Sequence, residues 1–461
     1  MAGLGFSQRI ALLVSGHLVL ASVPMLVAMV AAPALAPTPS PAPAQGMGGR
    51  GLWVEFGVAL GYAALGLFAV QFVLIGRVGV LSRRIGQDSL LGLHKWAGIA
   101  AAAFLWAHPV VLIAARPGYA EFFDPRVNAP RALALAAALA AITGLIVLSV
   151  LRRRLGLPYE WWRLTHAGLA ALLMLIALAH SVMVGHYTST IATIAMTAAF
   201  CLAPLAILGW VHVVGPLRRR PWRVSAVEPV RPRVWAVELT TDDQNAGIAF
   251  EPGQFAWLAF GDGPLQLRQH PFTIASSAGA KGQRQQRLAF TIKELGDFTA
   301  TIGQLPVGTR AWVEGPAGGF GLPPHARGAI LIAGGIGITP MLSILRTMAD
   351  RGDRRRAILL YGNETLEKAA HTDELEALGK RLDLAIIHVP EQPPEHAPDG
   401  WQGPSGYIDR AMLERVVDRD RLEGDHALVC GPDAMMDAVE DALLALGVGR
   451  ERIHSERFNI V

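Results

Sequence analysis

The stretch LHKWAGIAAAAFLWAH, residues 93–108, is apolar enough to lie in a membrane, yet it carries a histidine near each end. About 20 apolar helical residues span a bilayer core, and ionisable side chains are costly there. A second stretch, THAGLAALLMLIALAH at 165–180, repeats the arrangement, with His166 and His180 again 14 residues apart. Fourteen residues are just under four helical turns, so both histidines of a stretch lie near one helix face, about 21 Å apart.

The apolar character is concentrated in the first half of the chain. Hydrophobic residues make up 52% of the 461 residues and charged residues 17%, which is too apolar for an ordinary soluble protein. After about residue 215 charges return at normal density, so we expect a membrane half followed by a soluble half. Six runs have roughly the length of a membrane span, namely 10–32, 52–76, 92–115, 131–151, 166–186 and 190–214.

The beginning of the chain allows two interpretations. The first run is followed by APALA, which resembles a signal-peptidase site, but 23 apolar residues are long for a signal peptide, so we favour a retained helix. Residues 33–50, rich in Pro and Ala, are expected to form an exposed linker. Neither interpretation changes the topology of the later helices.

Short basic runs indicate how the helices are oriented. RVGVLSRR, LRRR and PLRRRPWR follow the second, fourth and sixth runs, and cytoplasmic loops collect Lys and Arg. The soluble half is therefore expected in the cytoplasm. The net charge is only +4, and we attribute the basic runs to topology, with no nucleic-acid partner. The third and fifth helices then run in the same direction, which brings His94 level with His166 and His108 level with His180.

Two matched histidine pairs predict two haem sites. Neutral imidazole is a good axial ligand for haem iron, and two bis-histidine haems, one near each leaflet, would explain the spacing. Histidines also line proton paths, so a proton-conducting membrane module with a nucleotide-sensing domain is the alternative. The two cysteines, Cys201 and Cys430, exclude a disulfide framework, a four-cysteine zinc site and a cysteine-ligated iron–sulfur cluster on this chain.

Residues 222–325 are expected to form a small antiparallel β-barrel. Short strand-like segments such as VWAVELT and GQFAWLAF alternate with turns. Within RQHPFTIAS, Arg268 can pair with a phosphate, Phe272 can pack on a flat ring, and the Thr273 hydroxyl can bond a ring nitrogen. Further on, Gly296 lets the backbone approach a ligand closely, and Thr299 adds a donor.

Residues 326–461 alternate strands and helices, which indicates a doubly wound α/β domain. Gly334, Gly335 and Gly337 sit at a strand-to-helix turn, where backbone amides can hold a pyrophosphate. Cys430 ends a later strand beside Gly431 and Pro432, where a nicotinamide could sit.

The soluble half resembles the ferredoxin–NADP reductase superfamily. The matching motifs are HPFT at 270–273 and residues 296–299 for the flavin, with GGIGITP at 334–340 and CGP at 430–432 for the pyridine nucleotide. With the paired histidines, nearly everything after residue 50 resembles the NADPH oxidase and ferric reductase family. The resemblance implies FAD, two b-type haems and NADPH or NADH. It assigns FAD to Arg268, His270, Pro271, Phe272, Thr273, Gly296, Thr299 and Phe458, and NAD(P)H to Gly334, Gly335, Gly337, Thr339, Pro340, Asn363, Cys430, Gly431 and Pro432.

Two points depart from the family pattern or stay open. Three residues follow Phe458, which weakens its assignment as the C-terminal aromatic that stacks on the flavin. Glu364 suits a ribose diol rather than a 2′-phosphate, but Lys368 and the run 354–356 are basic, so both NADH and NADPH remain candidates.

The expected molecule is a multi-pass protein of the bacterial inner membrane. A di-haem domain (1–217) precedes a FAD domain (222–325) and a NAD(P)H domain (326–461), both cytoplasmic. The acceptor on the outer side is a ferric chelate or dioxygen, giving superoxide, with a quinone or a partner protein as further options. His186 lies just beyond the outer pair and could touch that acceptor. Arg116 and Arg126 could attract an anionic acceptor, or belong to a solvated loop.

Overall fold

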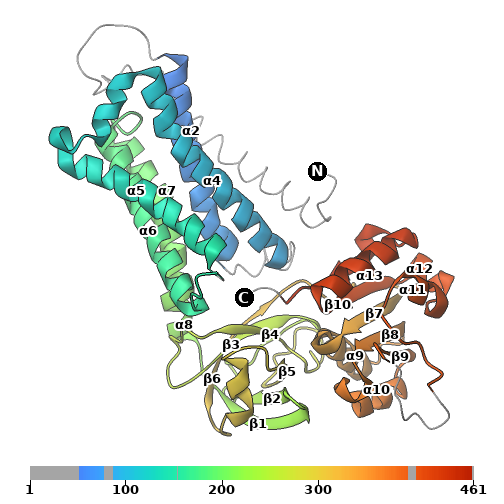
Figure 1. Cartoon of the computed structure of the whole chain (residues 1–461). Coiled ribbons are helices and arrows are strands. Elements are labelled where there is room, and N and C mark those ends of the chain that lie inside the picture. Colours follow the sequence, from blue (N-terminus) through green and yellow to red (C-terminus); the bar gives the residue numbers. More distant parts are fainter. Residues whose placement is uncertain (1–50, 77–86, 153, 393–400, 459–461) are drawn as a thin grey trace. The chain divides into compact units, whose positions relative to one another are not determined.

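The computed structural model describes residues 51–76, 87–152, 154–392 and 401–458 (Figure 1). These residues form two compact units. The first contains residues 51–76 and 89–214, and the second contains the residues from 215 onward. Each unit is described by itself below.

The first unit is a bundle of long apolar helices. Five helices in the described part of the chain are long and apolar enough to cross a membrane. The first expected span, 10–32, lies outside the described residues. The helices are α2 (Leu52–Ile75), α4 (Gln87–Ala115), α5 (Pro125–Leu151), α6 (Tyr159–Val184) and α7 (Ile191–Gly209), with the short elements η1 (Pro117–Phe123) and η2 (Trp210–Val214). The short helix α8 (Gly215–Arg218) already belongs to the second unit.

Several helices begin earlier than the apolar runs predicted. Helix α5 starts at Pro125 rather than 131, because Asp124 caps it by accepting a hydrogen bond of 2.8 Å from the Arg126 backbone N–H. Helix α6 starts at Tyr159 rather than 166. Hydropathy detects only the apolar part of a span, whereas caps and polar first turns extend the helix beyond it.

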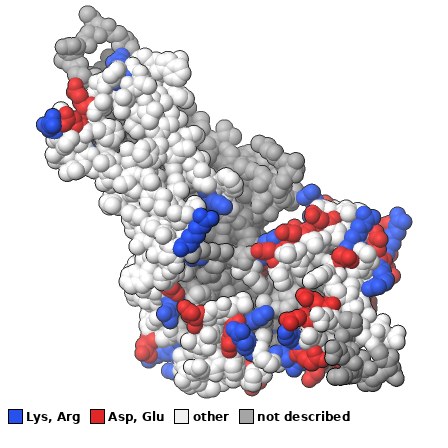
Figure 2. Space-filling view, viewed as in Figure 1, with Lys and Arg blue, Asp and Glu red and all other residues white. Residues whose placement is uncertain are grey.

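The bundle packs small and apolar side chains inside and leaves large apolar ones outside. Met174 and Cys201 are fully buried between α2, α6 and α7, and Ile142 and Leu173 pack in a second cluster with α4. Trp96, Trp161 and many Leu and Val side chains are exposed, and Figure 2 shows few charged side chains on the viewed face of the bundle. Such a surface suits lipid, which makes the chain a multi-pass membrane protein.

The second unit begins with a six-stranded antiparallel sheet in the order β4-β3-β6-β1-β2-β5. A bridge between Ile274 and Phe290 joins its two edges, around a core that contains Trp222, Leu239 and Phe290. Strands β1 and β4 were not predicted, since β1 contains charges and a proline. The strands are β1 (Trp222–Arg231), β2 (Val234–Thr240), β3 (Phe255–Phe260), β4 (His270–Thr273), β5 (Arg287–Lys293) and β6 (Arg310–Ala317).

A five-stranded sheet follows, in the order β11-β10-β7-β8-β9, with every pairing parallel. Along β7, Leu331 faces the cluster under α9 and α10, whereas Ile330 and Ile332 face α11, α12 and α13. Helices therefore cover both faces, as a doubly wound fold requires. The elements are β7 (Gly328–Gly334), α9 (Ile338–Arg351), β8 (Arg356–Asn363), α10 (Thr372–Gly379), β9 (Leu384–Pro390), α11 (Arg410–Val416), α12 (Arg419–Gly424), β10 (His426–Cys430), α13 (Asp433–Ala445) and β11 (Ile453–Ser455).

Helix α9 joins the two sheets of this unit. The buried Ser343 hydroxyl donates to the carbonyl of Ser276 over 3.0 Å, and the Ala278 N–H donates to Thr347 Oγ1 over 2.9 Å. Arg346 donates to the Ala275 carbonyl over 2.7 Å. Because the Ser343 and Thr347 hydroxyls are buried and hydrogen-bonded, they hold the loop after β4 against the parallel-sheet domain.

Candidate functional site

The four histidines of the sequence pattern form two facing pairs. The ring centroids of His94 on α4 and His166 on α6 lie 6.1 Å apart. Those of His108 on α4 and His180 on α6 lie 6.3 Å apart. The bundle thus brings together the residues that the 14-residue spacing paired, and their role as haem ligands stays a prediction.

These separations fit an iron held between two imidazoles. Two metal–nitrogen bonds of about 2 Å and two ring radii of about 1.1 Å add to roughly 6 Å between centroids. Among the described residues, no three His, Cys, Asp or Glu side chains gather into a group that could hold a metal ion. A pair can nevertheless serve a porphyrin-bound iron, which needs only two axial ligands.

Helix α2 orients the His108 ring. His108 Nδ1 lies 2.7 Å from the Gly57 carbonyl oxygen. A carbonyl only accepts, so this nitrogen carries the proton and Nε2 keeps a lone pair for a metal. Gly61, one turn further along α2, leaves space for the His108 ring, because a Cβ there would lie 2.9 Å from His108 Nδ1.

The other pair is also held by neighbouring helices. Ser149 on α5 places its hydroxyl 3.2 Å from His166 Nδ1. A terminal atom of the buried Gln71 amide on α2 lies 2.6 Å from His94 Nδ1. The same atom lies 2.9 Å from the His94 carbonyl oxygen, and the other amide atom lies 2.9 Å from the Gly98 backbone nitrogen. A carbonyl only accepts and a backbone N–H only donates, so these contacts favour the amide nitrogen toward His94. The sequence reasoning overlooked Gln71, although a lone amide in an apolar span is a visible signal.

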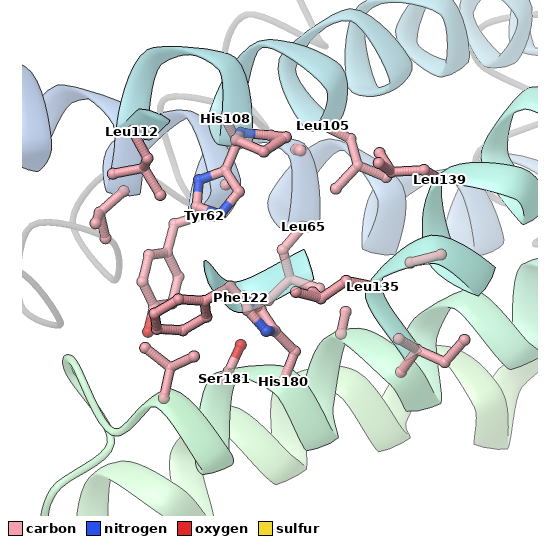
Figure 3. A pocket seen from close by; sticks show the side chains of 18 of the residues that line it. Tyr62, Leu65, Leu105, His108, Leu112, Phe122, Leu135, Leu139, His180 and Ser181 are labelled. Atoms are coloured by element: carbon pink, nitrogen blue, oxygen red, sulfur yellow. The ribbon is translucent and has the colours of Figure 1, made fainter. Parts of the chain in front are cut away.

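An apolar cavity separates His108 from His180. Together with the part that is open to solvent, it comprises about 1540 Å³ of space, and Figure 3 shows the two rings on opposite sides of it, with Tyr62 and Phe122 at its border. Its walls come from α2, α4, η1, α5 and α6, and His186 also lines it. Its apolar walls and two opposed imidazoles suit a flat, largely apolar ring system that carries a metal.

A second pocket lies in the second unit and comprises about 840 Å³, including the part open to solvent. It collects most residues predicted to bind FAD. Arg268 and Gly296 do not line it, and Arg268 is exposed just before β4. Thr299 lines it while capping the turn before η3 (Thr299–Gln304), where its hydroxyl accepts from the Leu295 N–H over 2.8 Å. The predicted residues that line the pocket are His270, Pro271, Phe272, Thr273, Thr299, Thr339 and Phe458.

This pocket fits a flavin by its polar atoms as well as its shape. The Thr273 hydroxyl is buried there and has no hydrogen-bond partner within the part of the chain that the structure describes. An orphaned buried hydroxyl is costly, and a ring nitrogen or carbonyl of a bound ligand would satisfy it. The Phe272 ring is stacked with Phe298 at 6.1 Å, which fixes an aromatic surface at the pocket.

The two glycine-containing turns meet. A Cβ on Gly337 would lie 2.1 Å from the Cys430 carbonyl oxygen, and one on Gly334 would lie 2.8 Å from Pro432 Cδ. Gly335 has φ +54, a conformation that favours glycine. The turns after β7 and β10 thus pack backbone to backbone at the carboxyl edge of the sheet, where such folds bind nucleotides. Thr339 Oγ1 donates to the Ile336 carbonyl over 2.7 Å, and Pro340 is buried in the first turn of α9.

The residues considered for coenzyme choice separate into two groups. Asn363 ends β8 at the carboxyl edge, and Glu364 pairs with Lys368 over 2.6 Å. Arg356 begins β8, at the opposite edge of the sheet, where it donates to Asp425. The expectation that 354–356 lie near the coenzyme phosphate is therefore not met, because a whole strand separates them from that edge.

The sequence reasoning also missed a buried carboxylate. Glu456 lines the flavin-type pocket, and its Oε1 lies 3.0 Å from where a Cβ of Gly318 would be. In the sequence Glu456 is a single acidic residue two positions before Phe458, and a single residue forms no recognisable motif.

Three family models match successive parts of the chain. Residues 60–178 match a ferric reductase like transmembrane component, 234–311 a FAD-binding domain, and 331–441 an oxidoreductase NAD-binding domain.

Curated relatives match about half of the chain. Ferredoxin–NADP reductase B of Sorangium cellulosum is 28% identical over 242 residues, 51% of this chain and 96% of that protein. The reductase component of propane 2-monooxygenase from Rhodococcus jostii is 27% identical over 249 residues, 53% of this chain and 64% of that protein. The glycine betaine monooxygenase reductase subunit of Chromohalobacter salexigens is 29% identical over 47% of this chain and 58% of that protein. The chain thus spans less than two thirds of the length of these two monooxygenase reductases.

Proposed function

This chain has the architecture of the ferric reductase and NADPH oxidase type, a ferric reductase-like transmembrane component followed by FAD-binding and NAD-binding domains, and from that premise we propose that it passes electrons from NAD(P)H, through FAD and two haem groups, to an acceptor on the far side of the membrane. The reductase-type domains support the first part, an NAD(P)H-dependent electron-transfer oxidoreductase. The haems, the direction across the membrane and the acceptor belong to the proposal.

The two histidine pairs carry the proposal. Each pair has the centroid separation that an iron between two imidazoles requires, 6.1 and 6.3 Å. Proton-path histidines would instead need water or carboxylates between them, and the cavity between His108 and His180 is predominantly apolar. Two stacked sites along α4 and α6 would give a route through the bundle, with His94 and His166 at one end and His108 and His180 at the other.

The residues of the second unit would position the soluble cofactors. Thr273 would bond the flavin ring, Phe272 and Phe458 would lie against it, and the backbone around Thr299 would face its pyrophosphate. The turns at Gly334–Gly337 and Cys430–Pro432 would hold NAD(P)H. When bound, FAD supplies the exchange between a two-electron hydride and single electrons, and haem iron takes those electrons one at a time.

The distribution of charge supports the proposed membrane orientation. Basic runs follow the second, fourth and sixth expected spans, which favours flavin and nucleotide domains in the cytoplasm of a protein of the bacterial inner membrane. Because histidines would fill both axial positions of each haem, reduction of a ferric chelate or of dioxygen, giving superoxide, would be outer-sphere.

A difference spectrum tests the proposal directly. We expect anaerobic NADH or NADPH to produce reduced b-type haem bands in the purified protein. His94→Ala should remove one of the two haem contributions and His180→Ala the other. Both variants keep Gln71 and Ser149, the neighbours of His94 and His166. The loss of a haem contribution would therefore result from the missing histidine alone. Timed re-oxidation by air or by ferric citrate then ranks the acceptors.

Two results would contradict the proposal. One is folded, flavin-loaded protein with no haem band, which would favour the proton-conducting alternative. The other is haem that stays oxidised when NAD(P)H reduces the flavin, which would show that the two units do not exchange electrons.

A further inference from the structure

Three ionisable side chains meet at the end of the bundle where α2 begins. The Tyr187 hydroxyl donates a hydrogen bond to Glu55 Oε2, and His186 Nε2 lies 3.5 Å from the same oxygen. The rings of His186 and Tyr187 are in edge-to-face contact, with centroids 4.5 Å apart. Residues 186 and 187 follow the C-cap of α6, Gly185, so the cluster joins the beginning of one helix to the end of another.

The carboxylate is unusual for its position. Glu55 is the only charged residue in α2, LWVEFGVALGYAALGLFAVQFVLI, and a membrane helix carries an ionisable group at a cost that function ordinarily explains. A purely structural link between α2 and the loop after α6 needs one donor and one acceptor, which an amide would supply. An acid, a phenol and an imidazole in contact instead form a set through which a proton can move.

The cluster connects the bundle surface with the cavity between His108 and His180. The Glu55 side chain is 30% exposed, that of His186 is 10% exposed, and Tyr187 as a whole residue is 4% exposed. His186 also lines the cavity. Exposure therefore falls from the carboxylate to the two groups behind it, and the imidazole reaches the cavity wall.

Other ionisable groups lie at this end as well, among them Arg116, Glu121, Asp124 and Arg126 in and beside η1. The Tyr62 ring lies 5.6 Å from the Tyr187 ring, and Tyr119 lines the cavity. Arg131 donates to the Glu121 carbonyl over 3.1 Å, and its guanidinium lies over the Phe122 ring. Within the described residues of this end, Glu55 and His186 are the acid–base pair in contact that has both an exposed member and a cavity-lining member.

We propose that Glu55, Tyr187 and His186 form a proton-transfer group for the acceptor reduced at this end of the bundle. The inference rests on the proposed electron transfer and deepens it, because it selects an acceptor that takes up protons together with electrons. A quinone has that chemistry. Two electrons from one NAD(P)H and two protons convert the quinone to the quinol, and the balance is NAD(P)H + H⁺ + quinone → NAD(P)⁺ + quinol. A ferric chelate reduced by one electron needs no such group.

The test compares two acceptors on the same pre-reduced protein. Full-length protein is reduced by NAD(P)H without oxygen and mixed either with a short-chain ubiquinone or with ferricyanide, which takes one electron and no proton. We expect Glu55→Gln to slow haem re-oxidation by the quinone tenfold or more and to leave the ferricyanide rate within about twofold. Glu160→Gln is the control, since Glu160 lies in the first turn of α6, at the other end of that helix.

A readout independent of turnover accompanies the kinetics. If Glu55 exchanges a proton when the nearby haem changes oxidation state, the redox infrared difference spectrum contains a carboxyl band that Glu55→Gln removes and Glu160→Gln keeps. Tyr187→Phe keeps the ring contacts but removes the hydroxyl, so it serves if Glu55→Gln does not accumulate folded protein. We expect it to slow the quinone reaction selectively as well.

Three outcomes would overturn the inference. Equal losses with both acceptors would make the cluster structural. Unchanged quinone kinetics in Glu55→Gln, or in Tyr187→Phe, would show that protons arrive by another route. If NAD(P)H reduces no haem in the unmodified protein, the proposed function itself fails, and the haem spectrum recorded before mixing distinguishes that case from the first two.

Discussion

At the scale of single residues, the histidine sites depend on what surrounds the second ring nitrogen. The Gly57 carbonyl fixes the proton on His108 Nδ1, and the missing side chain of Gly61 makes room for the ring. Such outer partners set the orientation and basicity of a metal ligand. The two glycines, four residues apart, therefore position one imidazole together: Gly57 by a hydrogen bond and Gly61 by leaving space.

We expect Gly61→Ala to disturb the site of His108 and His180 alone. The added Cβ would lie 2.9 Å from His108 Nδ1, so the ring must shift away from its position opposite His180. Low-temperature EPR of the oxidised protein should lose one of two low-spin haem signals. Gly98→Ala is the control, because a Cβ at Gly98 meets nothing within 4 Å. Two unchanged signals in Gly61→Ala would show that the space at Gly61 does not position His108.

A second residue-scale prediction concerns Thr273. Removing its buried hydroxyl, which has no partner among the described residues, with Thr273→Val should weaken FAD retention about fivefold, since one hydrogen bond contributes about 1 kcal/mol. The measurement is fluorescence titration of flavin released from, and rebound to, the full-length protein. Thr309→Val is the control, because the Thr309 hydroxyl donates locally to the Pro306 carbonyl. Equal FAD affinity in the two variants would remove Thr273 from the flavin site.

At the scale of elements, α9 links the antiparallel sheet to the parallel one. Arg346 on α9 donates to the Ala275 carbonyl and also pairs with both carboxylate oxygens of Glu374 on α10, each over 2.6 Å. Burial raises the pKa of the Glu374 carboxyl, but hydrogen bonds and charge from His371 and Arg346 outweigh it and lower this pKa to about 2.

The depressed pKa predicts a stability that is lost in acid. The folded value lies below the ordinary 4.5 of Glu374, so the contribution is present above that value and disappears as pH falls toward 2. Because the side chain is 34% exposed, we discount the shift for solvent screening to about 1–2 kcal/mol. Glu374→Gln should lower the unfolding midpoint of the second unit at pH 7 and flatten its dependence between pH 5 and 3. Glu423→Gln, in an exposed pair with Arg419, should change neither.

The elements also show which features a sequence can reveal. Apolar runs located the five described spans, and the 14-residue spacing paired the histidines correctly, because a helix has one fixed geometry. Strand β4 escaped prediction, since its four residues are recognisable only once paired with β3. Glu456 and the cluster at Glu55 escaped because their partners come from distant parts of the chain, and Gly61 because only packing shows what a missing side chain accommodates.

At the scale of the whole molecule, the described residues divide into two units with separate cores. The flavin-type pocket and the nucleotide turns belong wholly to the second unit, and the histidine pairs to the first. The two half-reactions should therefore be separable by mutation.

We expect His166→Ala to separate them. In vesicles whose second unit faces the medium, the variant should keep NAD(P)H-dependent reduction of a dye outside within about twofold, because no residue of that unit is changed. Reduction of an encapsulated acceptor should fall at least tenfold. Thr165→Ala, next in sequence but with its hydroxyl donating to its own helix, is the control. Loss of both activities in His166→Ala would mean that the units depend on each other for folding.

Because the two histidines of each pair face each other across α4 and α6, insertions and deletions in these helices are restricted. One residue inserted between His94 and His108 would rotate the second ring about 100° around α4 and move it about 1.5 Å along the axis. A matching insertion between His166 and His180 would turn both rings away rather than restore them. Both 14-residue intervals are thus closed to insertion and deletion, whereas a change of length between α4 and α5 leaves the facing of both pairs unchanged.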